Sequence, residues 1–259
     1  MPPAGRPCSF IDLTSHHISV VDLLTAWIRQ NHTLAEGFET DRKDRTREDG
    51  PAELTPTDDA AAARLLADYH QARGYADTIL DIPNRSITPE LIIVLSEWLT
   101  ELETRWPGEK TRARDLARLS LCRALGTKES RKSVAIPALI SQFDHAKNIN
   151  VHTRSAAGIA LYDIPAGKEY FDQLAAIAAD REFGKSRAMV VTWLGKSRHP
   201  DAAAVAVAQL DDETVQGNAL DALSKMRAQG VREQVEPFLK AKQSWHRRLA
   251  ERILRYDQS

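Results

Sequence analysis

Arginine recurs at regular positions where its guanidinium group could bind a phosphate or a carboxylate. Four arginines stand seven residues before a leucine, namely Arg118, Arg154, Arg187 and Arg247. Guanidinium groups hold either kind of anion through paired hydrogen bonds, so this ladder could grip phosphates. Acidic residues also recur between the segments that carry these arginines, at Asp144, Asp180 and Asp211. We therefore interpret the four arginines as a structural ladder of ion pairs between neighbouring segments.

A second set of cations lies in the expected turns within these segments and near the last one. Its members are Lys128, Arg131, Lys132, Lys196, Arg198, His199, Arg227, Arg232, Arg247 and Arg248. Equivalent turns of a stacked array fall along one edge, so we expect a basic edge that binds nucleic acid phosphates or an acidic protein surface. An alternative is that Lys128, Lys196 and Arg227 only compensate the dipoles of the helices that end there. That alternative leaves Arg131 and Arg232 unexplained.

Recognisable catalytic and metal-binding motifs are missing from the sequence. There is no His-Glu-x-x-His and no Cys-x-x-Cys pattern, and Cys8 and Cys122 have neither metal-ligand spacing nor an expected disulfide. The tripeptide that begins at Gly184 resembles the end of a phosphate loop but lacks its first glycine. His16 and His17 are adjacent without a recognisable third ligand. We expect no enzymatic activity, no cofactor and no metal.

From Lys110 onward the chain repeats a pattern of small and apolar residues. Segments align on Leu125, Leu161, Leu194, Leu223 and Leu254, at spacings of 36, 33, 29 and 31 residues. Each reads roughly Arg-x-x-Ala-x-x-Ala-Leu-Gly, which places the small residues on one helix face and lets another helix approach closely. Second helices are expected over 134–143, 168–179, 201–210 and 231–240. One helix pair cannot bury both of its faces, so the pairs must stack.

These residues resemble the short HEAT repeats of phycobilin-lyase-like and other bacterial proteins. The resemblance covers residues 110–259 and implies an all-α fold, a right-handed α-solenoid of HEAT-like helix pairs. Members of the family include scaffolds, regulatory subunits, toxin-neutralising partners, pigment lyases and a few DNA-binding glycosylases, so the resemblance specifies a fold rather than a function. The sequence departs from the pattern at Gln216, where the arginine is missing, and at Trp193, where we expect a bulky ring to fill the core.

The region before the repeats is organised differently. Residues 1–15 contain three prolines and are expected to form a flexible tail. Residues 16–109 are expected to form a divergent helical region, interrupted by a charged linker over 36–56. The middle of that linker, 39–50, contains no aliphatic residue and therefore cannot bury a face.

Two helix starts are marked in this region. Thr57 or Asp58 is expected to cap the helix after the linker. Thr88 and Pro89 form a clear start signal, a capping residue followed by proline at the first helical position. The helix that they begin is expected to run to Trp106, before a Pro-Gly pair.

The charge is unevenly placed along the chain, although the net charge is only −1. Residues 1–110 hold 11 Lys and Arg against 19 Asp and Glu, and residues 111–259 hold 24 against 17. This asymmetry indicates different surfaces in the two parts, unless folding intermixes them. The start of the sequence lacks the pattern of a signal peptide, and no apolar stretch approaches the ~18 residues of a membrane span. We expect a cytoplasmic protein.

These features favour a protein that binds another macromolecule. We expect a non-enzymatic protein–protein interaction module, such as the immunity or inhibitor partner of a bacterial toxin or a regulatory scaffold, whose partner has an acidic surface. The alternative is a nucleic-acid-binding protein resembling the HEAT-fold alkylpurine DNA glycosylases. A pigment lyase or chaperone is a third possibility, for which no pigment-holding residues are recognisable.

Overall fold

The computed structural model describes residues 55–257, which belong to one compact unit, Leu54–Ser259. Every regular element within this range is a helix, and the range contains no strand. The all-α expectation is therefore confirmed for this part of the chain. The expected tail at 1–15 and nearly all of the expected linker at 36–56 lie outside the described residues.

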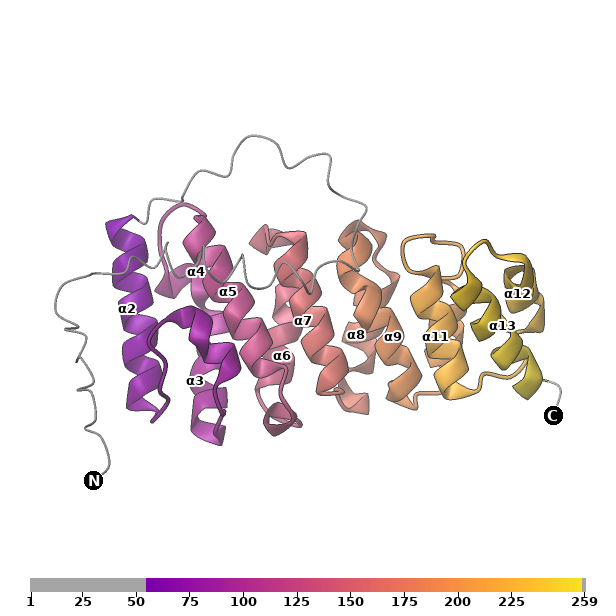
Figure 1. Ribbon diagram of the computed structural model, residues 1–259, viewed down its shortest axis with the longest axis horizontal. Helices are drawn as coiled ribbons and strands as arrows, with labels where there is room; N and C mark the ends of the chain where they lie inside the picture. Colours follow the sequence, from indigo (N-terminus) through magenta and orange to yellow (C-terminus); the bar gives the residue numbers. More distant parts are fainter. Residues whose placement is uncertain (1–54, 258–259) are drawn as a thin grey trace, which may run out of the picture. The chain divides into compact units, whose positions relative to one another are not determined.

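Ordinary α-helices alternate with short 3-10 helices along the described range. In chain order they are α2 (Pro56–Gln71), η2 (Ile79–Asn84), α3 (Pro89–Thr100), α4 (Leu102–Arg105), α5 (Arg112–Leu125), η3 (Lys128–Ser130), α6 (Ala135–Ile140), η4 (Ser141–Phe143), η5 (His145–Lys147), α7 (Val151–Asp163), η6 (Lys168–Tyr170), α8 (Phe171–Ala179), η7 (Arg181–Arg187), α9 (Ala188–Ser197), α10 (Ala202–Val207), α11 (Gln216–Met226), α12 (Arg232–Val235), η8 (Glu236–Lys240) and α13 (Ser244–Tyr256). Figure 1 shows the α-helices standing beside one another in chain order.

Helix α2 begins with a capping box. The hydroxyl oxygen of Thr55 accepts a hydrogen bond from the backbone N–H of Asp58, and the Asp58 carboxylate accepts one from the N–H of Thr55, both at 3.1 Å. The expectation that Thr57 or Asp58 is the cap is wrong. Pro56 occupies the first helical position, where its missing N–H costs nothing, so the helix starts earlier.

Helix α3 begins as expected and ends early. The hydroxyl of Thr88 accepts from the N–H of Leu91 at 3.3 Å, which confirms the cap before Pro89. The helix does not run to Trp106. The backbone leaves helical values at Glu101 (φ −104°, ψ 19°), and the short helix α4 follows.

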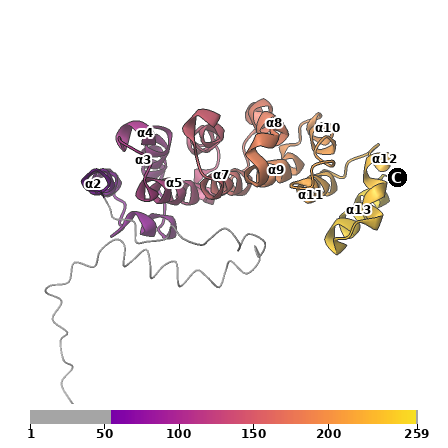
Figure 2. The same cartoon turned by 90° about the horizontal axis from the view of Figure 1, so that it is seen from above.

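Helices α5, α7, α9, α11 and α13 carry the repeated segments, and each packs on the next. Figure 2 shows α5, α7, α9 and α11 as one row, with α8 and α10 in a second row beside it. The aligned leucines Leu125, Leu161, Leu194, Leu223 and Leu254 are all buried. At Gly195 an added Cβ would lie 2.9 Å from the backbone oxygen of Ala222, so glycine permits the close approach of α9 and α11.

The second helix of each pair is less regular than the repeat pattern predicts. The expected helices at 134–143, 168–179, 201–210 and 231–240 are α6 with η4, η6 with α8, the shorter α10, and α12 with η8. Pro237 explains the last division, because proline has no N–H for the α-helical hydrogen bond and so ends α12 within one turn.

Buried tryptophans pack the first described helices together. Trp98, Trp106 and Trp193 have exposed fractions of 2%, 1% and 0%, so Trp193 fills the core as expected. The indole N–H of Trp106 donates to the Asp58 carboxylate at 2.8 Å, and that of Trp98 donates to Asp68 at 2.9 Å. The Thr111 hydroxyl also donates to the Asp58 carboxylate, at 2.7 Å, and α3 packs on α5, so residues 55–109 are joined to the repeated segments.

Candidate functional site

The candidate binding surface is formed by the turns inside the helix pairs, where one helix of the row ends and its second helix begins. Lys128 begins η3, and Arg131 and Lys132 follow it. All three side chains are exposed. Within residues 55–257, the side chains of Arg131 and Lys132 have no hydrogen-bond or ion-pair partner, whereas Lys128 lies 3.7 Å from the carboxylate of Glu129. The first turn therefore presents two uncompensated cations.

The corresponding turns after α9 and α11 share a backbone conformation. Arg198 and Arg227 are the residues that end these helices, and both are left-handed, with φ of 54° and 50°. A non-glycine residue rarely adopts this conformation, although it is common just after a helix. Because α9 and α11 pack side by side, the two arginines occupy equivalent places in adjacent turns.

Tyr162, at the end of α7, lies against lysines from the next two helix pairs. The Nζ atom of Lys196 is 3.3 Å from the centroid of the Tyr162 ring and donates to the Tyr162 backbone oxygen at 2.9 Å. The Nζ atom of Lys225 is 4.9 Å from the centroid and donates to the phenol oxygen at 2.9 Å. The hydrogen bond from Lys225 lowers the pKa of the Tyr162 hydroxyl. These contacts join the turns after α7, α9 and α11.

Lys225 remains a strong cation in this cluster. Burial lowers the pKa of its ammonium group, but hydrogen bonds to Asp221 and to the Tyr162 hydroxyl outweigh burial, so the net shift of the pKa is upward. Lys196 also donates to a backbone oxygen at the end of α7, in the preceding pair, whereas the alternative considered above assigned it to the dipole of its own helix, α9. The two lysines thus have a structural role as well as a positive charge.

A pocket of about 530 Å³ opens between the turns after α9 and α11. Its polar lining comes from Lys196, Arg198, His199 and Lys225, and Leu194 and Met226 are among its apolar lining residues. The His199 ring stacks on Phe171, with the ring centroids 3.7 Å apart and the planes 12° apart. The Arg198 side chain is exposed and has no partner within residues 55–257. This pocket can accept an anionic group.

The remaining cations of the expected basic edge are placed less uniformly. Arg227 lies with its guanidinium carbon 5.1 Å from the centroid of the Tyr256 ring, and Arg232 is half-buried at the start of α12. Arg247 and Arg248 lie in the first two turns of α13, whereas Arg227 follows the last turn of α11. The structure therefore divides the residues of the basic edge between turns inside the pairs and the start of a helix.

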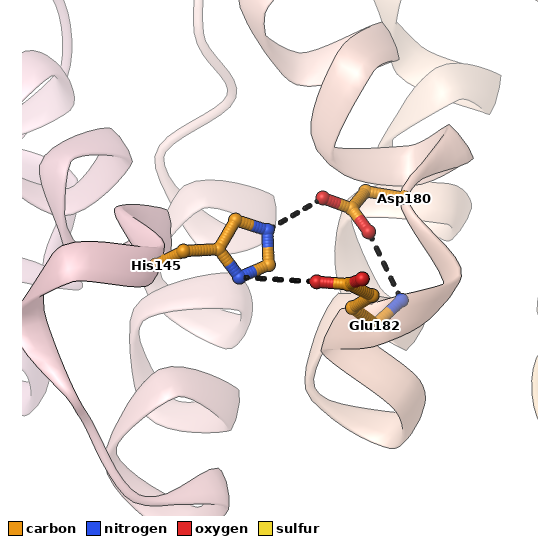
Figure 3. Close-up of side chains that lie close together, drawn as sticks. All are labelled: His145, Asp180 and Glu182. Carbon is orange, nitrogen blue, oxygen red and sulfur yellow. Dashed lines mark hydrogen bonds and ion pairs between the residues drawn. The ribbon is translucent and has the colours of Figure 1, made fainter.

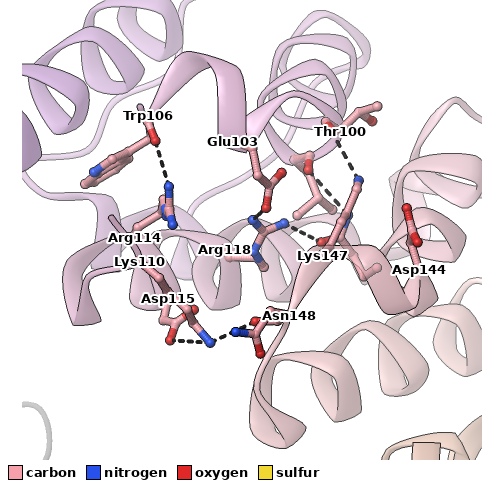
Figure 4. Close-up of polar contacts among 12 residues, drawn as sticks. Thr100, Glu103, Trp106, Lys110, Arg114, Asp115, Arg118, Asp144, Lys147 and Asn148 are labelled. Carbon is pink, nitrogen blue, oxygen red and sulfur yellow. Dashed lines mark hydrogen bonds and ion pairs between the residues drawn. The ribbon is translucent and has the colours of Figure 1, made fainter. Parts of the chain in front are cut away.

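Each ladder arginine lies in a helix of the row or directly before it, and Arg118, within α5, shows how these residues bind (Figure 4). The Arg118 guanidinium forms an ion pair with Glu103 and donates to the side-chain oxygen of Gln142 at 2.7 Å. Arg118 is 3% exposed. Figure 4 also shows Lys147 directed at the backbone oxygen of Thr100, at 3.4 Å. Burial lowers the pKa of Lys147. The network joins α4, α5 and the turn after α6.

The other ladder arginines bind different groups. Arg187 is 0% exposed, donates to the side chain of Gln209 at 2.8 Å, and contacts both the Ala178 backbone oxygen and the Asp212 carboxylate. Arg154 donates to the backbone oxygen of Gln142 at 3.1 Å. Arg247 donates to the backbone oxygens of Ala241 and Lys242 at 2.7 and 3.0 Å. Arg118 and Arg187 therefore form ion pairs with carboxylates, whereas Arg154 and Arg247 donate to backbone oxygens.

Two buried glutamines complete the ladder, and sequence reasoning missed both. Gln142 lies in η4 and Gln209 lies two residues after the end of α10, and each accepts a hydrogen bond from a ladder arginine. Their exposed fractions are 0% and 3%. The signal available in the sequence is their spacing, since Gln142 and Gln209 stand two and three residues before the acidic residues Asp144 and Asp212.

No arrangement typical of nucleophilic catalysis is found among the described residues. Burial raises the pKa of the Cys122 thiol to about 12, so this cysteine is a core residue rather than a nucleophile. The basic pocket instead offers ammonium, guanidinium and imidazole groups, which can bind a carboxylate or a phosphate.

Comparison with known proteins adds no relative. No protein-family model matches the sequence, and no match was found among curated proteins or solved structures. No helix within residues 55–257 combines the length and the apolar character needed to cross a bilayer. The class that the described residues establish is an all-helical protein of packed helices.

Proposed function

We propose that the chain is a HEAT-like α-solenoid with a binding role, and that its partner is a protein with an acidic surface. Inhibition of a toxin and regulatory scaffolding both use a surface of this kind. The proposal does not involve catalysis. The observation that carries it is the set of exposed, uncompensated cations in the turns inside the helix pairs, next to a pocket with basic side chains.

The order of helix contacts supports the solenoid. Each helix of the row from α5 to α13 packs on the next, and second helices contact their own pair, as in stacked repeats. The buried alanine and leucine positions recur with the same phase in each pair. Ala157, Ala219 and Ala250 are all 0% exposed. A solenoid places equivalent turns along one edge, which makes the scattered cations one surface.

The charges on that edge favour an acidic protein over a nucleic acid. Arg131, Lys132 and Arg198 are free to pair with carboxylates of a partner. Acidic side chains lie among these cations, because Asp163 ends α7 and Asp201 precedes α10. A duplex presents continuous negative charge and would be repelled by them, whereas a protein surface can match a mixed pattern.

The aromatic groups at the turns also argue against binding of unstacked bases. Single-stranded nucleic acids stack on aromatic rings that are open to them. The Tyr162 ring instead contacts the ammonium groups of Lys196 and Lys225. Phe171 is 4% exposed and stacks on His199. Neither ring is open as a stacking platform.

The test compares two labelled probes by fluorescence anisotropy with the full chain. One is a glutamate-rich peptide and the other is a duplex DNA of equal charge, each titrated at about 50 mM and about 150 mM NaCl. We expect saturable binding of the peptide at both salt concentrations and weaker binding of the duplex. Tighter binding of the duplex would replace the proposal with the nucleic-acid alternative. If neither probe binds, the proposal that the partner is a protein with an acidic surface is wrong.

A further inference from the structure

A cluster of one imidazole and two carboxylates spans two successive turns between helix pairs (Figure 3). The Nε2 atom of His145, in η5, lies 2.7 Å from Oδ2 of Asp180. Its Nδ1 atom lies 3.7 Å from Oε2 of Glu182, at the start of η7. One ligand atom from each of the three residues lies within 4.8 Å of the other two. These residues lie in the turns between helix pairs, whereas the proposed binding surface is formed by the turns inside them.

Neighbouring contacts hold two of the three side chains in place. The His145 ring stacks on Phe183, with the centroids 4.3 Å apart and the planes 8° apart. The Oδ1 atom of Asp180 accepts from the backbone N–H of Glu182 at 2.9 Å, which leaves Oδ2 directed at the imidazole. Glu182 is 82% exposed at its side chain and can rotate. Two ligands are therefore oriented in advance and the third can move to them.

We propose that His145, Asp180 and Glu182 bind one divalent transition-metal ion of the Zn²⁺ class. Imidazole nitrogen and carboxylate oxygen are ligands that Zn²⁺ takes at about 2.0–2.2 Å, and tetrahedral bonds of that length set ligand atoms about 3.3 Å apart. The ion would bond to Nε2, whose distance of 2.7 Å to Oδ2 of Asp180 needs only a small widening. Glu182, which faces Nδ1, would rotate toward the Nε2 side to supply the third bond. Water would fill the fourth position. Two carboxylates balance the charge of the ion.

Arg154, a cation close to this cluster, is directed at other groups. The guanidinium carbon of Arg154 lies 5.0 Å from the centroid of the Phe183 ring, on which the His145 ring stacks. Its nitrogen atoms donate to the backbone oxygens of Gln142 and Asp144, at 3.1 and 3.5 Å. The Arg154 charge weakens the binding of a metal without occupying the ligand atoms, so we expect a site of moderate affinity.

The ion would join the turn after α6 to the turn after α8. Without a metal, His145 and Asp180 already form an exposed hydrogen bond, which alone contributes little to stability. A metal that binds the folded chain and not the unfolded chain raises the midpoint of thermal unfolding, and the increase grows with the logarithm of the metal concentration above the Kd. The inference therefore concerns how two neighbouring helix pairs are held together, and it is independent of the acidic partner.

The test is titration of the full chain with ZnCl₂ by isothermal calorimetry and thermal unfolding, with MgCl₂ as the comparison metal. We expect one Zn²⁺ per chain, an increase in the unfolding midpoint and no response to Mg²⁺, which prefers an oxygen-only octahedron. His145→Gln and the pair Asp180→Asn with Glu182→Gln should each weaken Zn²⁺ binding at least ~10-fold. The absence of saturable binding by the unchanged chain overturns the proposal.

Matched variants separate this site from other ligands on the chain. His152→Gln and Glu213→Gln change exposed residues of the same types outside the cluster and should leave the affinity for Zn²⁺ unchanged. The sequence also contains the adjacent pair His16 and His17. If His145→Gln binds Zn²⁺ as tightly as the unchanged chain, the metal binds elsewhere and the assignment is wrong.

Discussion

The ammonium nitrogen of Lys196 lies 3.3 Å from the centroid of the Tyr162 ring, and the backbone oxygen of Tyr162 accepts its hydrogen bond at 2.9 Å. Lys225 reaches the hydroxyl of the same tyrosine from the following helix pair. Tyr162 occupies the position where three of the other four segments have glycine or serine. The Tyr162 ring thus contacts residues of the next two turns, and it orients Lys196 and Lys225, which line the basic pocket.

Replacement of Tyr162 should reveal how much the ring contributes. Tyr162→Leu removes both ammonium–ring contacts and should lower the free energy of unfolding by about 1–2 kcal/mol. Tyr162→Phe keeps the ring and loses only the hydrogen bond from Lys225, so it should retain most of that stability. Urea unfolding followed by circular dichroism measures both variants. Equal losses in the two variants would mean that the hydroxyl, and not the ring, joins the turns.

Two arginine–aspartate ion pairs, Arg187–Asp212 and Arg181–Asp211, differ in their burial. Arg187 is buried and pairs with Asp212, whereas Arg181 and Asp211 are exposed. Arg187→Met should lower the free energy of unfolding by about 3 kcal/mol, because Asp212 and Gln209 lose the cation that they accept from. Arg181→Met should cause no measurable change, because water screens exposed pairs. Chemical unfolding of both variants tests the contrast, which fails if Arg181→Met is the more damaging change.

Asp58 is a buried carboxylate that accepts from Trp106 at 2.8 Å and from Thr111 at 2.7 Å. Burial alone would raise its pKa, but these hydrogen bonds outweigh burial and lower the pKa. Asp58→Ala removes the acceptor of these two donors and of the backbone N–H and hydroxyl of Thr55, and should reduce the free energy of unfolding by about 3 kcal/mol. Asp59→Ala changes the exposed neighbour and should stay within about 0.5 kcal/mol of the unchanged chain. Similar losses from both changes would contradict the role assigned to Asp58.

Because the His246 imidazole is buried, we expect that acidification destabilises the fold. It is 4% exposed, its Nδ1 has no partner, and burial lowers the pKa of the imidazole from 6.5. The unfolded chain therefore binds a proton at a higher pH than the folded chain does. The contribution to stability is present above about pH 6.5 and is lost as the pH falls toward the lower folded pKa, with a slope of up to about 1.4 kcal/mol per pH unit.

Unfolding free energies between about pH 7.5 and about pH 5.5 measure this slope. His246→Leu should flatten it, while His152→Leu, which replaces an exposed histidine, should keep it. Carboxylates with lowered pKa values, such as Asp58 and Asp212, lose their contributions only as the pH falls below 3.8, the usual pKa of an aspartate, and so do not affect this window. An unchanged slope in His246→Leu would assign the acid sensitivity to another group.

Local sequence signals predicted the helices well and their partners poorly. The spacing of seven residues from Arg187 to Leu194 marks a helix that the structure contains, and Thr88 before Pro89 marks a helix start. Helix α3 stops early at Glu101, and no local residue type signals that stop. Pro237 does explain why α12 is short. The hydrophobic periodicity indicates which face of a helix is buried. It does not indicate at which residue the backbone angles leave helical values.

Contacts over long sequence distances explain the rest. Lys196 and Lys225 lie 34 and 63 residues after Tyr162, so nothing near the tyrosine indicates its role. Gln209 resembles a surface residue in the sequence and is buried beneath Arg187 in the structure. His145 and Asp180 belong to different turns, which become neighbours only when the helix pairs pack.

The most direct test of the proposed binding surface compares two variants that carry the same change in charge. The first variant replaces Arg131, Lys132 and Arg198 with glutamine. The second variant replaces three other exposed cations with glutamine, namely Lys185, Arg252 and Arg255. Binding of the labelled glutamate-rich peptide is measured by anisotropy at a single salt concentration. The first variant should bind about 10-fold more weakly, at roughly 0.5 kcal/mol per exposed contact, and the second should match the unchanged chain. Equal weakening in both variants would show that net charge, and not the turns inside the helix pairs, determines binding.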